Sequence, residues 1–259
     1  MIPSHVAERL VRDKAWHHDF EIVPGVWTRG AYNPSALWHE LDLPDDMRGL
    51  ALADVGASSG FFSFEARKRG AHVVAFDLRH RDNSGFGLAQ HINGLTDIEH
   101  HHVNVLDMQP RDYGQFDVVL AMGLLYHTAD PYRALANCAA LCTGRLVVES
   151  YCIDALLPPD VAASPIMRFI ADPRRFPGRD QPNTDRSNFW GFTGACLRRM
   201  VEDVGFTSTR CRVSGDRALI DARHAGVDPA STRLPLAYGL GPHVPVRDDR
   251  DDPASWTQF

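Results

Sequence analysis

The 259-residue sequence has no apolar run approaching the roughly 18 to 20 residues that span a membrane. Its first residues reach charged side chains at once and show no hydrophobic signal-peptide region. No two cysteines form a Cys-x-x-Cys pair, and their number is odd, at positions 138, 142, 152, 196 and 211. We therefore expect a cytoplasmic protein, not membrane-bound, with reduced and mostly buried thiols rather than a disulfide framework.

Lysine is also scarce, since only Lys14 and Lys68 occur among 27 basic residues. With 33 acidic residues the net charge is −6, and the sequence contains no block of basic residues. This balance counts against nucleic acid as the main partner, although a local arginine patch would override it. The composition, 44% hydrophobic and 23% charged, is that of a globular chain long enough for one large core.

Short apolar segments alternate with amphipathic ones after Gly49, which is typical of a parallel sheet with helices on both faces. Two last strand-like runs joined by Ser214-Gly215-Asp216 predict an antiparallel hairpin. We expect an α/β, Rossmann-like sheet of seven strands, mostly parallel, with that hairpin at its C-terminal end. The predicted strands cover 50–55, 72–76, 101–105, 116–121, 145–150, 207–213 and 217–222, and the predicted helices cover 1–20, 61–69, 85–95, 130–141 and 193–204.

Changes in this pattern suggest where the parts of the chain begin and end. The alternation lapses after residue 155, where prolines gather, and a segment this long inside a domain is usually a lid. The expected parts are an N-terminal helical cap and loop (1–46), a nucleotide-binding core (47–155), a lid insertion (156–190), a C-terminal helix and hairpin (191–226) and a polar tail (227–259). We expect the tail to be partly disordered, the alternative being an arm onto a second subunit of a homodimer.

An acid followed by a glycine loop ends the first predicted strand, in the order Asp54-Val55-Gly56-Ala57-Ser58-Ser59-Gly60. The glycines allow a tight turn, and the helix that follows offers free N–H groups. Asp77 ends the second strand, where a carboxylate accepts hydrogen bonds from both hydroxyls of a ribose. A dinucleotide fingerprint requires G-x-G-x-x-G, whereas this chain has G-x-x-x-G after an acid. That acid would repel a pyrophosphate but suits the cationic end of S-adenosylmethionine, which is therefore favoured over a nicotinamide cofactor.

On these residues the chain resembles the class I S-adenosylmethionine-dependent methyltransferases, over about 48–222. The resemblance implies that the acid and glycine loop hold the methionine part, that the acid ending strand two binds the ribose, and that the loop after strand three frames the adenine. The cofactor residues so implied are Asp54, Gly56, Ala57, Ser58, Gly60, Phe61, Asp77, Leu78, Asn104, Val105, Leu106 and Met122.

The run from Phe116 to His127 is similar to one branch of that family, as are the stretches Leu146–Ser150 and Asn188–Trp190. The branch includes the bacterial enzyme that alkylates hydroxyuridine at the tRNA wobble position, and relatives that act on small molecules. The tRNA enzyme has a longer N-terminal region and a more basic surface. Since both are missing here, the resemblance implies the chemistry more than the substrate.

The expected catalytic residues follow the fourth and fifth strands, at the sheet edge where open α/β folds bind ligands. An alcohol that attacks a sulfonium methyl group must lose a proton, and a base such as histidine accelerates that step by roughly 10²–10⁴-fold. We expect His127 to be this base, the alternative being a packing role. Glu149 would orient His127 or bind an acceptor hydroxyl, unless it pairs with an arginine. Tyr126 would line the methyl site or belong to the core.

The expected acceptor is a hydroxyl of a soluble small molecule, with a sugar or secondary metabolite preferred. The residues expected to bind it are Trp27, Arg29, Tyr32, Tyr151, Asp154, Asn188 and Trp190. No metal is expected, because the consecutive residues His100, His101 and His102 would point to opposite faces of a strand. Two alternatives stay open, a tRNA wobble-uridine methyltransferase or carboxymethyltransferase and a non-catalytic protein that binds S-adenosylmethionine.

Overall fold

The computed structural model describes residues 2–170 and 187–224. They form two compact units, one within Met1–Asp107 and the other within Met108–Gly241. The predicted polar tail, 227–259, and residues 171–186 of the predicted lid lie outside the described residues. Among the helices of the described part, none is long and apolar enough to cross a membrane.

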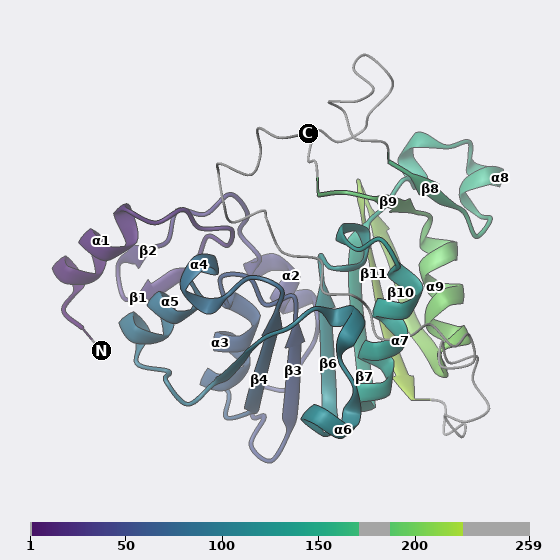
Figure 1. Ribbon diagram of the computed structural model, residues 1–259. Coiled ribbons are helices and arrows are strands. Elements are labelled where there is room, and N and C mark those ends of the chain that lie inside the picture. The colour runs from purple at the N-terminus through teal and green to yellow at the C-terminus, as the bar shows by residue number, and fades with distance from the viewer. Residues whose placement is uncertain (1, 171–186, 225–259) are drawn as a thin grey trace, which may run out of the picture. The chain divides into compact units, whose positions relative to one another are not determined.

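Three parallel strands form the sheet of the first unit, in the order β3 (Ala51–Val55), β4 (His72–Asp77) and β5 (Glu99–His102). Figure 1 shows β3 and β4 side by side. In β4 every residue after His72 is buried, as expected of a strand covered on both faces. The register places Val55 beside Phe76 and Asp77 beside His102. The carboxyl ends of these parallel strands therefore lie along one edge.

The predicted helices of this unit are present as α3 (Phe61–Lys68) and, over 85–95, as α5 (Phe86–Asn93), preceded by the short α4 (Arg81–Ser84). The predicted helix over 1–20 is wrong after its first half, because α1 is Ser4–Arg12. Trp16 folds back instead, and its indole Nε1–H donates to the carbonyl of Val11 at 3.0 Å.

Three short elements of the first unit were not predicted. They are the antiparallel pair β1 (Glu21–Val23) and β2 (Val26–Trp27) and the helix α2 (Ser35–Glu40). Each is too short to show a hydrophobic period in the sequence.

Four strands form the sheet of the second unit. The strand β6 (Phe116–Met122) is parallel to β7 (Cys142–Tyr151), β11 (Arg217–His224) is antiparallel to β7, and β10 (Phe206–Ser214) is antiparallel to β11. The predicted C-terminal hairpin is therefore confirmed. The helices α7 (Pro131–Leu141) and α9 (Gly194–Asp203) match the predicted ones, with the short α6 (Pro110–Tyr113) before β6.

A buried ion pair joins two of these strands. Arg145 of β7 donates from Nε and Nη2 to the two carboxylate oxygens of Asp221 in β11, at 2.9 Å each. Arg210 of β10 adds a third contact at 3.0 Å. Arg145 and Asp221 are both more than nine-tenths buried, so this ion pair compensates charges that are largely removed from water.

The described ends of the predicted lid carry short elements: a 3-10 turn η3 (Asp154–Leu156), the helix α8 (Pro159–Ala162) and the antiparallel pair β8 (Met167–Phe169) and β9 (Trp190–Phe192).

All seven predicted strands are present. Among these seven, β3, β4 and β5 pair in parallel, as do β6 and β7, and the C-terminal hairpin is antiparallel, which confirms the predicted α/β class. The third strand differs most, since it spans Glu99–His102 rather than 101–105. It stops because the side chain of Asn104 accepts a hydrogen bond from the backbone N–H of Leu106, and the chain turns into the 3-10 turn η1 (Val105–Asp107).

Candidate functional site

The loop Gly56–Gly60 leaves the end of β3 in a tight turn. Gly56, Ser58 and Gly60 have φ angles of 83°, 50° and 90°, a region that favours glycine. At Gly60 an added Cβ would lie 2.6 Å from the ring of Phe64. The backbone N–H groups of Gly56 and Ala57 donate to the carbonyl of Phe76 in β4, at 2.8 and 3.1 Å, and so fix the loop against the neighbouring strand.

Asp77, the last residue of β4, is held at both of its carboxylate oxygens. Oδ2 accepts from the backbone N–H of Ser58 at 2.7 Å, and Oδ1 accepts from that of Arg79 at 2.7 Å. The residue is nine-tenths buried. Each oxygen has a second lone pair, so a carboxylate oriented in this way can accept from a pair of neighbouring hydroxyls such as those of a ribose.

Asp54 is a buried acid near the end of β3, only 1% exposed. Its Oδ2 accepts a hydrogen bond from the hydroxyl of Ser63 in α3 at 2.6 Å. Burial raises the pKa of Asp54 to about 6, against the effect of the Ser63 hydrogen bond, and the charge of Asp77 adds to the rise. A buried carboxylate with a raised pKa is stabilised by a cation, so Asp54 suits the ammonium group of an amino acid.

The other predicted cofactor residues divide by burial. Val105 and Leu106 in η1 are buried, Asn104 shapes that turn, and Leu78 after β4 is half-buried. Phe61 is 4% exposed and lies among the rings of Phe20, Trp38 and Phe62, as a core residue does. Met122, the last residue of β6, belongs to the second unit.

The N-terminal segment is tied to the glycine loop. The backbone N–H of His17 donates to the hydroxyl of Ser59 at 3.1 Å, and the backbone of Tyr32 exchanges hydrogen bonds with His17 and Asp19. Trp27 and Tyr32 are 45% and 42% exposed, and Arg29 is exposed with a φ of 56°. These residues therefore belong to the surface of the first unit, on the segment that contacts the loop.

A polar cluster of the second unit joins Tyr126, Glu149 and Arg217. Arg217 donates from Nη1 to the Tyr126 hydroxyl at 2.9 Å, and the same Nη1 lies 3.4 Å from the carboxylate of Glu149. Its guanidinium carbon also lies 5.3 Å from the centre of the Tyr126 ring. Burial raises the pKa of Glu149, and the charge of Arg217 partly opposes the rise.

Sequence reasoning missed Arg217. Its only signal was the place directly after the hairpin turn Gly215-Asp216, where the antiparallel register sets Arg217 opposite Tyr151 and two residues from the position opposite Glu149. The Glu149 carboxylate contacts Arg217, which is the arginine pairing that the sequence left open.

His127 ends the 3-10 turn η2 (Leu125–His127), and its Nδ1 contacts Ser187 twice. The carbonyl oxygen of Ser187 lies at 3.2 Å and its hydroxyl at 2.9 Å. Two further hydrogen bonds involve the same segment: Phe189 N–H donates to the carbonyl of Tyr126 in the turn at 2.8 Å, and Trp190 Nε1–H donates to the carbonyl of Ala129, just after the turn, at 3.3 Å. Asn188 and Trp190 are thus brought to the turn that carries Tyr126 and His127.

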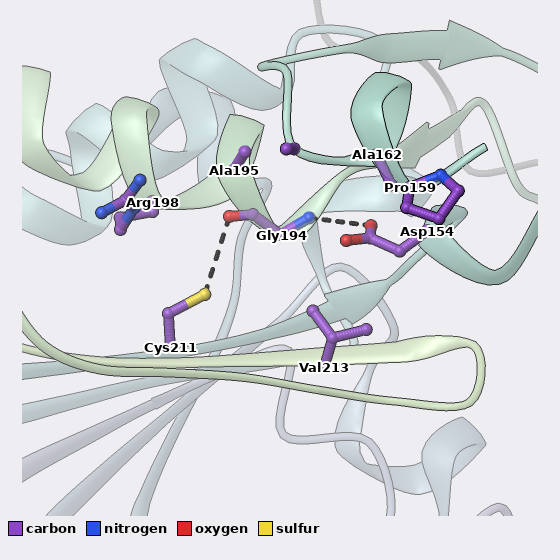
Figure 2. Close-up of a pocket in the computed structure, with 9 residues that line it drawn as sticks. Asp154, Pro159, Ala162, Gly194, Ala195, Arg198, Cys211 and Val213 are labelled. Atoms are coloured by element: carbon purple, nitrogen blue, oxygen red, sulfur yellow. Dashed lines mark hydrogen bonds between the residues drawn. The ribbon is translucent and has the colours of Figure 1, made fainter. Parts of the chain in front are cut away.

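Asp154 serves the fold of the second unit. Its Oδ2 accepts from the backbone N–H of Gly194, the first residue of α9, at 3.0 Å and from the thiol of Cys152 at 2.8 Å. Figure 2 shows this carboxylate turned toward Gly194, on the wall of an open cavity of about 540 Å³ that Arg198 and Cys211 also line. Tyr151, at the end of β7, is buried, with its ring 6.2 Å from that of Tyr126.

Within residues 2–170 and 187–224, no three His, Cys, Asp or Glu side chains gather as a metal site would require. In β5 the ring of His100 packs on Phe86 while that of His101 stacks on Phe76. All five cysteines are free thiols, four of them buried and Cys211 exposed.

Residues 53–145 match the model of a family described as a methyltransferase domain. Among curated proteins, the chain is 32% identical to a ubiquinone biosynthesis O-methyltransferase of Aromatoleum aromaticum over 39% of this chain and 44% of that protein. It is 25% identical to a tRNA U34 carboxymethyltransferase of Helicobacter pylori over 63% of each chain. The chain spans about half the length of the Aromatoleum aromaticum relative and of two others with the same name.

Among solved structures, one match covers most of this chain. The N-terminal domain of EvdMO1, with S-adenosylhomocysteine bound, superposes with a TM-score of 0.59 and 18% identity, covering 86% of this chain and 97% of that domain. At this identity the match identifies the fold.

Proposed function

We propose that this protein transfers a methyl group from S-adenosylmethionine to a hydroxyl of a soluble small molecule, because residues 53–145 match a family described as a methyltransferase domain and the fold superposes on a domain solved with S-adenosylhomocysteine bound. The observation that carries the proposal is the pair of acids at neighbouring strand ends in the first unit. Asp77 is oriented at both oxygens to receive a ribose, and Asp54 is a buried acid that suits an ammonium group.

The cofactor residues in this proposal are those of the first unit and Met122. Gly56, Ala57, Ser58 and Gly60 supply the turn and its backbone N–H groups to the methionine part, and Leu78 flanks the ribose acid. Asn104, Val105 and Leu106 frame the adenine, with two buried apolar side chains for its faces. Phe61, the first residue of α3, contributes to the cofactor site from the core side of the loop. Trp27, Arg29 and Tyr32 cover the cofactor from the N-terminal segment.

His127 is the general base of the proposed reaction. The acceptor oxygen attacks the methyl carbon as its proton passes to the imidazole; the methyl–sulfur bond breaks and its electron pair stays on sulfur, which leaves as a neutral thioether. If Nδ1–H donates to the Ser187 carbonyl, the lone pair that takes the proton is on Nε2. Tyr126, Glu149 and Arg217 form the polar wall against which the acceptor binds. Tyr151 and Trp190 border it from β7 and β9, whereas the carboxylate of Asp154 is turned toward Gly194.

The small-molecule acceptor is supported by the charge balance, −6 overall, which disfavours a polyanion. A relative named for O-methylation in ubiquinone biosynthesis supports a hydroxyl as the methylated group. The curated relatives reported above are named for ubiquinone and tRNA, so they lend no support to the sugar acceptor preferred from the sequence.

Calorimetry with S-adenosylhomocysteine tests the cofactor part of the proposal. Wild-type protein should bind it, and Asp77→Ala should weaken binding at least tenfold, because two hydrogen bonds to a charged group are lost. Asp97→Ala is the matched control, since Asp97 is an exposed acid of the same unit that pairs with Arg67. No heat with the wild-type protein, or equal weakening in both variants, would contradict the proposal.

A tRNA wobble uridine is the second candidate acceptor, with a methyl or carboxymethyl group transferred. A relative of that name matches 63% of this chain, about as much as the 65% matched by one of the relatives named for ubiquinone biosynthesis. A carboxylated donor needs a cation near the transferred group, and Arg217 beside Tyr126 supplies one that sequence reasoning did not find. Binding of tRNA that weakens steeply with salt would favour this candidate.

A further inference from the structure

Asn188 lies just before β9, in a segment that is hydrogen-bonded to the turn η2. Its two neighbours are both hydrogen-bonded to that turn, Ser187 to the imidazole of His127 and Phe189 to the carbonyl of Tyr126. The position of Asn188 is therefore fixed relative to the two residues proposed to meet the acceptor.

The side chain of Asn188 points inward. The residue is 5% exposed, whereas its neighbour Phe189 is 37% exposed, as expected when side chains alternate along an extended segment. Within the described part of the chain, neither Oδ1 nor Nδ2 of Asn188 has a hydrogen-bond partner. A donor and an acceptor are thus held together in the interior, next to the turn, with neither satisfied.

Burying a hydrogen-bond donor and an acceptor without partners costs free energy, so both atoms are expected to have partners in the functional protein. A leucine of similar shape would fill the same space without unsatisfied polar atoms, so the amide does not increase the stability of the ligand-free protein. A trapped water could satisfy it, but then the amide would stabilise the protein without any ligand. A ligand that offers its own acceptor and donor side by side satisfies both atoms at once.

We propose that Asn188 is a specificity-determining residue that recognises a vicinal diol in the acceptor. One hydroxyl donates to Oδ1 and the neighbouring hydroxyl accepts from Nδ2–H, and one of the two is the hydroxyl that is methylated. This inference rests on the proposed function, because it places the acceptor at the turn of Tyr126 and His127. The vicinal diol is the shared chemistry of a catechol and of a sugar ring, and the experiment distinguishes the two.

The test measures probe binding by calorimetry to the full chain saturated with S-adenosylhomocysteine. The catechol arm compares 3,4-dihydroxybenzoate with 4-hydroxybenzoate, and the sugar arm compares methyl β-D-galactoside with its 3-deoxy analogue. The wild-type protein should bind one diol about five- to a hundredfold more tightly than its analogue, because the analogue leaves half of the buried amide unpaired. The arm in which this preference appears identifies the source of the diol.

Two variants separate recognition from stability. Asn188→Leu should reduce the preference below twofold while leaving the affinity for S-adenosylhomocysteine unchanged, and Asn188→Ala provides the same comparison if the leucine variant does not fold. The matched control is Ser150→Ala, because Ser150 of β7 is also fully buried with an unpartnered hydroxyl in the described structure. The control should keep the wild-type preference.

In calorimetry, the proposal is overturned if neither diol is preferred or if both Asn188 variants keep the preference. In urea unfolding of the ligand-free protein, it is overturned if the midpoint for Asn188→Leu is lower than that for Ser150→Ala. The last result would show that the amide has a structural partner such as a trapped water. Binding of uracil, which carries an imide and no diol, would overturn it in favour of an imide ligand if that binding depends on Asn188. Failure of the proposed function is distinct, since S-adenosylhomocysteine would then give no heat with the wild-type protein.

Discussion

Replacement of Asp54 by asparagine should make the ligand-free protein more stable and should weaken cofactor binding. Asp54 is 1% exposed, and burial raises its pKa from an ordinary value of 3.8 to about 6. The folded protein therefore binds this proton more tightly than the unfolded chain. The group stabilises the fold below pH 3.8, and that contribution is lost as the pH rises through about 6.

The size of the effect follows from the two pKa values. Their difference corresponds to about 3 kcal/mol of destabilisation by the ionised group at neutral pH, as an order of magnitude. An asparagine carries no charge, and its amide oxygen can still accept the hydrogen bond from Ser63. Asp54→Asn should therefore raise the free energy of unfolding at pH 7.5 by about 1–3 kcal/mol and change it little at pH 3.5.

Cofactor binding should change in the opposite direction. The asparagine cannot pair with the ammonium group of S-adenosylhomocysteine, so we expect the Kd to rise at least tenfold. In the wild-type protein the Kd should also rise about tenfold between pH 7.5 and pH 5, because about one tenth of Asp54 is ionised one pH unit below a pKa of about 6.

Urea unfolding at both pH values and calorimetry with S-adenosylhomocysteine measure the two effects. Asp97→Asn is the control, because Asp97 is an exposed acid whose pKa is lowered by the hydrogen bond with Arg67, and its loss should not stabilise the protein. The reasoning is refuted if Asp54→Asn is less stable than the wild type at pH 7.5, or if the wild-type Kd does not change between pH 5 and pH 7.5.

Three further predictions follow from particular contacts. His127→Ala should lower kcat by roughly 10²–10⁴-fold with an unchanged Kd for S-adenosylhomocysteine, while Ser187→Ala, which keeps the carbonyl, should stay within about threefold in a steady-state assay; equal kcat values for His127→Ala and wild type would refute the base role. Asp221→Asn should cost about 3–5 kcal/mol in urea unfolding, because it leaves the charge of Arg145 buried without its partner, and a loss below 1 kcal/mol would contradict this. Gly60→Ala should reduce both thermal stability and cofactor affinity, since its φ is 90° and an added Cβ meets a ring at 2.6 Å; an unchanged Tm would show that the loop adapts.

Much of the proposed cofactor site could be predicted because its determinants are local. The apolar runs that became β3 and β4 are continuous, and the acid–glycine loop and Asp77 follow directly from their ends. A strong hydrophobic period over about ten residues is enough to predict a helix or a strand. The errors lie where that period is absent, as in residues 13–40, where Trp16 folds back and three short elements depend on packing.

The sequence by itself thus determined the order of strands and helices, the α/β class and the residues at the strand ends, because each depends on neighbours along the chain. Only the tertiary structure decided that Arg217 contacts Tyr126, 91 residues away, and that Ser187 contacts His127, 60 residues away. The first contact depends on the register of β11 against β7, and the second on where the lid segment returns to η2. Neither contact can be predicted from a local hydrophobic period, because both depend on hydrogen bonds between segments that are far apart in the sequence.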